Sequence, residues 1–242
     1  MLRNSRMLCN RIAIYATFLF SIFIPVDAQV QPVGVGGGVG VNLADHMLIK
    51  YAEKSLHGTP TERIDGSPYL SDEYAKGEIY SDHGKYSDVM IRYNIFADHL
   101  EFRLNNAVYI LDPNPKIMRK VQLGDLTLVV DQIETSLPPG LFILLDSGKI
   151  TLLLKKVIVF REKQEPKAIE TTGKPARYAT APDVMYLRIG NEKLTKVTNL
   201  KKMIATFPDH NEEMMQFAKE KKISSNKPDE LKLLVNYYNN YK

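Results

Sequence analysis

The stretch VMIRYNIF, residues 89–96, decides the fold because its side chains alternate with a period of two. Its odd-numbered positions are all apolar or aromatic, whereas arginine and asparagine occupy two of the even-numbered positions. Such alternation is typical of a β-strand that buries one face. Leu100, Phe102 and Leu104 resume the alternation after a short break. The two stretches together therefore predict a β-hairpin.

Short apolar stretches separated by turn residues continue this pattern on both sides of the hairpin. The turn residues are Asp82-His83-Gly84-Lys85, Gly124-Asp125, Asp146-Ser147-Gly148 and Gly190-Asn191. The sequence predicts an α+β, mainly β fold, an antiparallel meander folded as a sandwich or a partly closed barrel. The expected strands are 77–80, 86–96, 100–104, 107–111, 118–123, 126–130, 141–145, 149–160, 184–189 and 193–197. Glu162 to Pro182 is polar and contains three prolines, so we expect a loop there.

Near the C-terminus, the spacing of apolar residues changes from every second position, as in a strand, to the spacing of a helix. Apolar residues within 200–207 follow the spacing i, i+3, i+4, i+7, which predicts a helix. Asp209 is the expected N-cap of a second helix, with Glu212 in capping-box spacing. Pro228 suits the first turn of a third helix. Leu43 to Leu56 has looser helical spacing and predicts a further short helix.

The N-terminus has the pattern of a secretory signal peptide. Three arginines precede an apolar run over 12–24, and Val26 and Ala28 supply the small residues of a cleavage site. We therefore expect an exported protein, in the periplasm or associated with the cell envelope, without a transmembrane segment after signal removal. The expected organisation is a signal peptide over 1–28, a Gly-rich flexible leader over 29–42, a mainly β domain over 43–197, and a C-terminal helical segment over 198–242 that packs on it.

Charge and cysteine content exclude several functions. The formal net charge of +4 falls to about +2 without the signal, which does not provide the basic surface that nucleic acid requires. Cys9 is the only cysteine and lies in the signal, so the mature chain has neither a disulfide nor a cysteine nucleophile. The sequence thus predicts stabilisation by a packed core.

Compact catalytic and metal-binding motifs are missing from the sequence. The histidines, at positions 46, 57, 83, 99 and 210, have no chelating spacing, so we expect no metal site. Ser147 lies in an expected hairpin turn rather than in a Gly-x-Ser-x-Gly elbow. The glycines of 34–40 lack the spacing of a dinucleotide fingerprint. We therefore predict no catalytic residue and no cofactor.

Carboxylates keep one enzymatic alternative open. Asp72, Glu73 and Glu78 cluster near the first expected strand. Paired carboxylates could carry out glycoside hydrolysis or bind calcium, provided that the fold holds them at a suitable separation. The alternative function is therefore an envelope hydrolase, and ordinary charged turn residues explain the same pattern.

Tyrosine is abundant, with 13 residues, and tryptophan is absent. Tyr69, Tyr74, Tyr80 and Tyr86 are the candidate partner-binding residues, because exposed tyrosine rings stack on sugars and anchor protein partners. Tyrosine is also a good strand former that half-buries well, which is the competing explanation.

The sequence contains three short motifs: Gly66-Ser67-Pro68-Tyr69-Leu70, Lys76-Gly77-Glu78 and the hairpin Tyr93-Asn94-Ile95-Phe96-Ala97-Asp98-His99-Leu100-Glu101-Phe102. These motifs resemble a family of secreted, β-rich proteins of unassigned function that is common in Bacteroidetes. The lysine-rich helical tail, 200–209 and 235–239, is similar too, so the resemblance covers most of 66–242; the Gly-rich leader lies outside it. It implies export and a β-rich architecture but no activity. The sequence thus favours an exported, non-catalytic module that is structural or binds an envelope protein or glycan.

Overall fold

The computed structural model describes residues 50–51, 64–104, 107–166 and 173–241. The expected signal peptide and leader, together with His46 and His57, lie outside these residues. The helix expected over 43–56 is wrong at Lys50–Tyr51, which form strand β1 and pair with β5. The rest of that expected helix lies outside the described residues.

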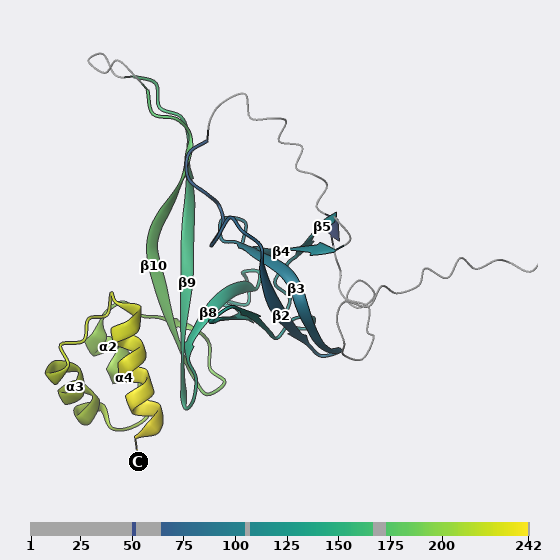
Figure 1. Cartoon of the computed structure of the whole chain (residues 1–242). Helices are drawn as coiled ribbons and strands as arrows, with labels where there is room; N and C mark the ends of the chain where they lie inside the picture. The colour runs from purple at the N-terminus through teal and green to yellow at the C-terminus, as the bar shows by residue number, and fades with distance from the viewer. Residues whose placement is uncertain (1–49, 52–63, 105–106, 167–172, 242) are drawn as a thin grey trace, which may run out of the picture. The chain divides into compact units, whose positions relative to one another are not determined.

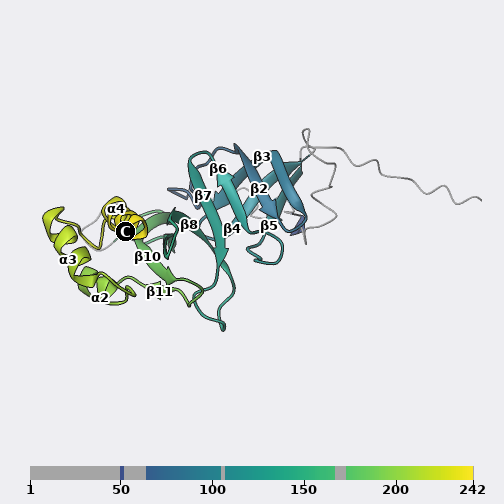
Figure 2. The same ribbon diagram turned by 90° about the horizontal axis from the view of Figure 1, so that it is seen from below.

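The mainly β fold is confirmed. Ten strands, β2 to β11, form an antiparallel meander sheet that is not closed, and β1 pairs with β5 at one edge (Figures 1 and 2). The strand order is β1-β5-β4-β3-β2-β6-β7-β8-β9-β10-β11, so two meanders meet where β2 pairs with β6. The strands are β2 Ala75–Ser81, β3 Gly84–Asn94, β4 His99–Leu104, β5 Ala107–Leu111, β6 Lys120–Leu123, β7 Leu126–Asp131, β8 Gly140–Asp146, β9 Ile150–Arg161, β10 Arg177–Ile189 and β11 Thr195–Lys196.

The hairpin turns lie where glycine and aspartate predicted them. Ser81 pairs with Gly84 across the β2–β3 turn, and Gly84 has a φ of +136°, which residues with a side chain rarely adopt. Asp98, in the β3–β4 turn, has a φ of +54°. Asp tolerates this left-handed conformation better than most residues.

The loop expected over Glu162 to Pro182 is wrong in its C-terminal part, because β10 begins at Arg177. Pro182 lies at a register shift between Ala181 and Val184, where the missing backbone N–H of proline is tolerated. Strand β8 pairs with β9 only over 152–154. The outer part of the β9–β10 hairpin, 157–161 with 177–181, is therefore a two-stranded ribbon, which we call the ribbon (Figure 1).

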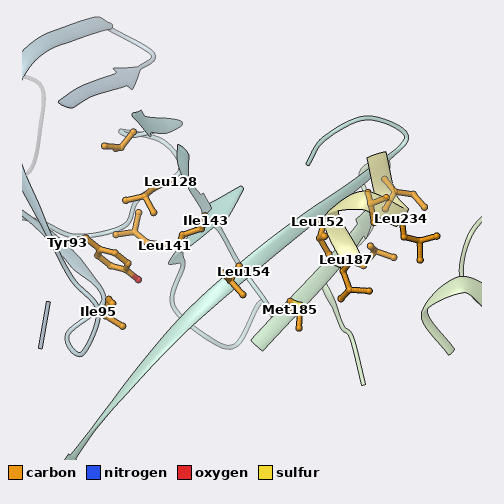
Figure 3. Packing of buried hydrophobic residues seen from close by; sticks show 14 of the residues in the cluster. Tyr93, Ile95, Leu128, Leu141, Ile143, Leu152, Leu154, Met185, Leu187 and Leu234 are labelled. Carbon is orange, nitrogen blue, oxygen red and sulfur yellow. The ribbon is translucent and has the colours of Figure 1, made fainter. Parts of the chain in front are cut away.

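Apolar side chains from both meanders and from the helices form the main core. Figure 3 shows Tyr93 and Leu141 at one end of this core and Leu234 at the other, with Leu154 and Met185 between them. Strand β3 follows the predicted alternation, since its buried side chains recur at every second position over 89–93, whereas β9 buries three consecutive residues, 152–154. A smaller cluster, Phe142, Leu153, Tyr186 and Leu194, packs separately.

Three helices follow the sheet: α2 Leu200–Ala205, α3 Asn211–Glu220 and α4 Pro228–Asn240. Helix α4 contacts β8 and β9, and the Asn239 amide both accepts from the backbone N–H of Ile150 (2.9 Å) and donates to its carbonyl (2.8 Å). This side chain therefore pairs with β9 as a neighbouring strand would. Among the described residues, no helix has the length and apolarity that crossing a membrane requires.

The first turn of α4 begins with Pro228, as predicted, but the capping of α3 differs from the prediction. The N-cap residue is His210, with a φ of +56°, and its side chain makes no capping hydrogen bond. Asp209 instead accepts a hydrogen bond of 2.6 Å from the Tyr238 hydroxyl. The capping-box prediction at Asp209 is therefore wrong, because a contact with α4 takes the carboxylate.

Candidate functional site

The four candidate tyrosines differ in exposure. Tyr69, Tyr74 and Tyr80 are partly buried, and Tyr86 is buried at 8% exposure, so the expected exposure is wrong for Tyr86. The Tyr86 hydroxyl has no hydrogen-bond partner in the described structure. The other three tyrosines belong to two separate polar clusters.

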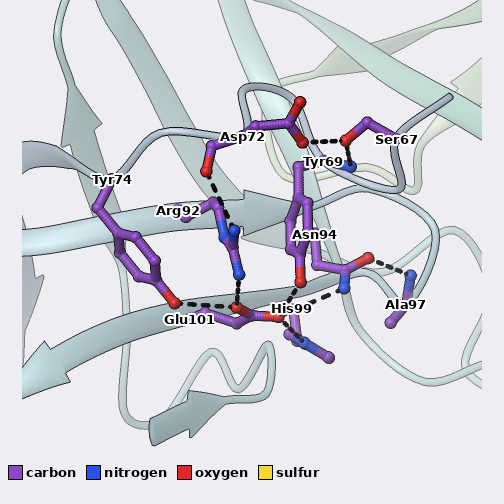
Figure 4. Close-up of polar contacts among 9 residues, drawn as sticks. All are labelled: Ser67, Tyr69, Asp72, Tyr74, Arg92, Asn94, Ala97, His99 and Glu101. Carbon is purple, nitrogen blue, oxygen red and sulfur yellow. Dashed lines mark hydrogen bonds and ion pairs between the residues drawn. The ribbon is translucent and has the colours of Figure 1, made fainter. Parts of the chain in front are cut away.

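The first cluster joins Tyr69 and Tyr74 to an ion pair on the sheet (Figure 4). Arg92 on β3 and Glu101 on β4 are directly opposite in the strand register, and their side chains pair at 2.5 Å. The Tyr69 and Tyr74 hydroxyls donate to the two oxygens of Glu101, at 3.0 and 3.1 Å. Both rings also contact the Arg92 guanidinium, at 3.5 and 4.5 Å from their centroids. We call these four residues the Glu101 cluster.

Backbone contacts place Tyr69 in this cluster. The Leu70 N–H donates to the carbonyl of Tyr93, and the Ile95 N–H donates to the carbonyl of Pro68, both at 2.9 Å. Arg92 also donates to the carbonyl of Asp72 at 3.1 Å. The segment before β2 is thus attached along β3, which brings two tyrosines onto an ion pair that is distant in sequence.

The electrostatics of the Glu101 cluster favour an ionised carboxylate and neutral tyrosines. Burial by itself raises the pKa of Glu101, but contacts with His99, Arg92 and Tyr69 outweigh it and lower the pKa to about 2. Burial and the negative charge of Glu101 raise the pKa of Tyr69 to about 12. A carboxylate with so low a pKa is a poor general base near neutral pH. The cluster therefore resembles a stabilising contact more than an acid–base centre.

The lowered pKa of Glu101 predicts an acid-sensitive contribution to folding. Because the folded-state pKa lies below the ordinary value of 4.5, this contribution is present above about pH 4.5 and is lost as pH falls toward 2. We expect the wild-type free energy of unfolding to fall across this range, and that of Glu101→Gln to fall less steeply. Urea unfolding at a series of pH values measures both, and parallel curves for the two proteins would contradict the assignment.

Tyr80 belongs to a second cluster on β2. Its hydroxyl donates to Glu78 at 2.6 Å, and Lys85 pairs with the same carboxylate at 2.6 Å. The Lys120 ammonium lies 4.2 Å from the centroid of the Tyr80 ring. Ring surfaces of Tyr69, Tyr74 and Tyr80 thus all contact cations within the protein, and these contacts compete with an external partner.

The carboxylates that suggested the alternative function, an envelope hydrolase, have ordinary surface environments. Asp72 and Glu73 are exposed, and Asp72 accepts from the Ser67 hydroxyl at 2.5 Å. Contacts with Lys85 and Tyr80 lower the pKa of Glu78, whereas a general acid requires a raised pKa. These environments do not favour the hydrolase alternative.

Metal ligands do not gather within the described part of the chain, where no group of three or more His, Cys, Asp or Glu could hold an ion. His99 Nε2 lies 3.6 Å from Glu101, and His210 Nδ1 lies 3.8 Å from Glu213. These two imidazoles therefore have carboxylate neighbours that contact them electrostatically when they are protonated.

An exposed aromatic cluster was not predicted from the sequence. The rings of Phe96 and Phe160 each lie 5.2 Å from that of Tyr178, in edge-to-face arrangements. Phe96 is 47% and Phe160 39% exposed, and Ile64, next to the bridge between Asp65 and Arg177, is 41% exposed. We call Phe96, Phe160 and Tyr178 the aromatic cluster. The sequence signal was weak, because Tyr178 lay in an expected loop and Phe96 at the end of an expected strand.

Comparison with known proteins adds no relative: no family model, no curated protein and no solved structure matches this chain. The resemblance to the Bacteroidetes family therefore stays a prediction.

Proposed function

We propose that this chain is an exported, non-catalytic module that binds an envelope or periplasmic partner through the aromatic cluster. Its export is expected from the signal-like N-terminus over residues 1–28. The observation that carries the binding role is the exposure of Phe96 and Phe160 around Tyr178. Aromatic side chains supply large contact areas at low entropic cost, and those exposed together mark interaction surfaces.

The same proposal moves the expected binding surface from the candidate tyrosines to the aromatic cluster. Tyr69 and Tyr74 already donate to Glu101, and Tyr80 donates to Glu78. A partner would have to compete with these internal contacts. By contrast, the rings of Phe96 and Phe160 have no polar atoms to satisfy and still expose much of their surface.

Crosslinking capture from a native envelope fraction tests the proposal. We expect the tagged mature protein to capture a reproducible partner, and the Phe96→Ser/Phe160→Ser variant to lose it. Leu233→Ser is the matched control, since Leu233 is also 47% exposed but lies on α4. Circular dichroism and urea unfolding establish that each variant is folded.

The variants also distinguish binding through the aromatic cluster from binding through the candidate tyrosines. The tyrosines would be the binding surface if a folded Tyr74→Ala/Tyr80→Ala variant loses the partner while Phe96→Ser/Phe160→Ser keeps it. Equal capture by all variants would overturn a binding role for either surface. Glycan partners are tested in the same way, with immobilised envelope polysaccharide in place of the crosslinked fraction.

A further inference from the structure

One edge of the ribbon lacks a partner strand within the described residues. Strand β8 leaves β9 after Leu154, whereas β9 continues to Arg161 with only β10 beside it. In an antiparallel pair, every second residue directs its N–H and C=O away from the partner strand. The β9 edge over 157–161 therefore presents hydrogen-bonding groups that an added strand could use.

The opposite edge of the ribbon is less suited to an added strand. Asp65 already occupies it, since its N–H donates to the carbonyl of Ala176 and its carbonyl accepts from the N–H of Tyr178, both at 2.9 Å. Pro182 and the register shift beside it interrupt the same edge further along. The β9 edge is thus the one that an incoming strand would favour.

Two arginines place positive charge at the outer end of the ribbon. Arg161 on β9 and Arg177 on β10 are directly opposite in the register, and both are exposed. Neither guanidinium has an ion-pair partner among the described residues. Like charges directly across a ladder repel, so a carboxylate beside Arg161 would relieve this repulsion. Arg also binds carboxylates in a two-pronged geometry.

The aromatic cluster lies on the other face of the same strands. Phe160 and Tyr178 form the cross-strand pair next to Arg161 and Arg177. Because side chains alternate along a strand, the aromatic pair and the arginine pair face opposite sides of the ribbon. An added strand would therefore place one residue beside Arg161 and the next beside Phe160.

We propose that an extended, acidic segment of a partner protein adds as a strand to the β9 edge over 157–161. An Asp or Glu of that segment pairs with Arg161, and the neighbouring apolar residue packs against Phe160 in the aromatic cluster. This inference rests on the proposed binding function and names the partner's chemistry. Charge complementarity with Arg161 favours an acidic partner, and the outward-facing backbone N–H and C=O groups of β9 favour an extended strand over a folded apolar surface.

Selection from a displayed library of random linear peptides on the immobilised mature protein tests the chemistry. We expect enriched peptides to contain an acidic residue next to an apolar or β-branched residue, and to lack proline in that stretch. Arg161→Glu should weaken the enriched peptide by about tenfold or more, with a weaker dependence on salt than wild type shows. The matched control is Lys201→Glu, which makes the same charge change at an exposed site on α2.

Backbone methylation tests strand addition itself. In an added strand only alternate N–H groups point to β9, so N-methylation of one alternate set of peptide residues should abolish binding while methylation of the other set is tolerated. Equal tolerance of both sets, enrichment of proline or basic residues, or equal binding to Arg161→Glu and wild type would overturn the inference. If these tests fail but Phe96→Ser/Phe160→Ser still loses the native partner, strand addition is wrong and the proposed binding function is still supported.

Discussion

Replacing Glu101 by Gln is expected to lower the free energy of unfolding by about 3 kcal/mol, the low end of the range for breaking a buried ion pair. The Glu101 side chain is 10% and the Arg92 side chain 18% exposed. Glutamine has nearly the same shape, so the loss comes from the missing charge and the missing second acceptor rather than from a cavity. Arg92 is then left largely buried between two tyrosine rings without a counter-ion.

Urea unfolding at neutral pH measures this loss, with Glu73→Gln as the matched control. Glu73 is exposed, and its side chain makes no described ion pair, so the control should change stability by less than about 0.5 kcal/mol. A loss of that small size for Glu101→Gln would contradict the importance of the cluster.

A double-mutant cycle identifies the cause of the loss. If the cost of Glu101→Gln comes from the Arg92 guanidinium that is left without a counter-ion, the double variant Arg92→Met/Glu101→Gln should lose clearly less free energy of unfolding than the sum of the losses of the single variants. Additive losses would mean that the tyrosine hydroxyls, and not the ion pair, account for the stability of the cluster.

The sequence predicted the hairpins well because their signals are local. Alternation over 89–96 and the glycine at position 84 act within a few residues, so strand and turn positions follow from them directly. The third helix was predictable for the same reason, since Pro228 marks its first turn. The type and position of these hairpins and of the third helix therefore needed no knowledge of long-range contacts.

The errors arose where a long-range contact overrides a local signal. Prolines at 175 and 182 predicted a loop, but β9 pairs with the strand from Arg177 on both sides of the register shift at Pro182. Asp209 had the spacing of an N-cap, but Tyr238 of α4 donates to it. Tyr69 and Tyr74 were predicted to be exposed, but Glu101 binds both from a strand some 30 positions away. Such contacts become visible only once the strand order is known.

A second large effect is expected at Asp98, which links the two meanders. It accepts from the Tyr93 hydroxyl (2.8 Å) on β3 and pairs with Lys155 (2.6 Å) on β9. Lys155 also donates to the carbonyl of Leu141 at 2.9 Å, and burial lowers the pKa of its ammonium despite the charge of Asp98. This one carboxylate therefore connects the β3–β4 turn to β9, and its ion pair offsets the cost of burying a lysine.

Asp98→Ala is expected to lower the free energy of unfolding by about 2 to 4 kcal/mol. It leaves Lys155 without its counter-ion, removes an acceptor from Tyr93 and places alanine at a φ of +54°. Asp98→Asn should cost less than Asp98→Ala, since asparagine tolerates this backbone conformation and still accepts from Tyr93, although it too leaves Lys155 without its counter-ion. Urea unfolding of both variants measures the difference. Lys155→Met, which removes the buried ammonium but keeps an apolar side chain of similar length, should reduce the further loss caused by Asp98→Ala. If Asp98→Ala costs the same with and without Lys155, the link between the meanders is not electrostatic, and the turn conformation and the Tyr93 hydrogen bond explain why aspartate stands at this position.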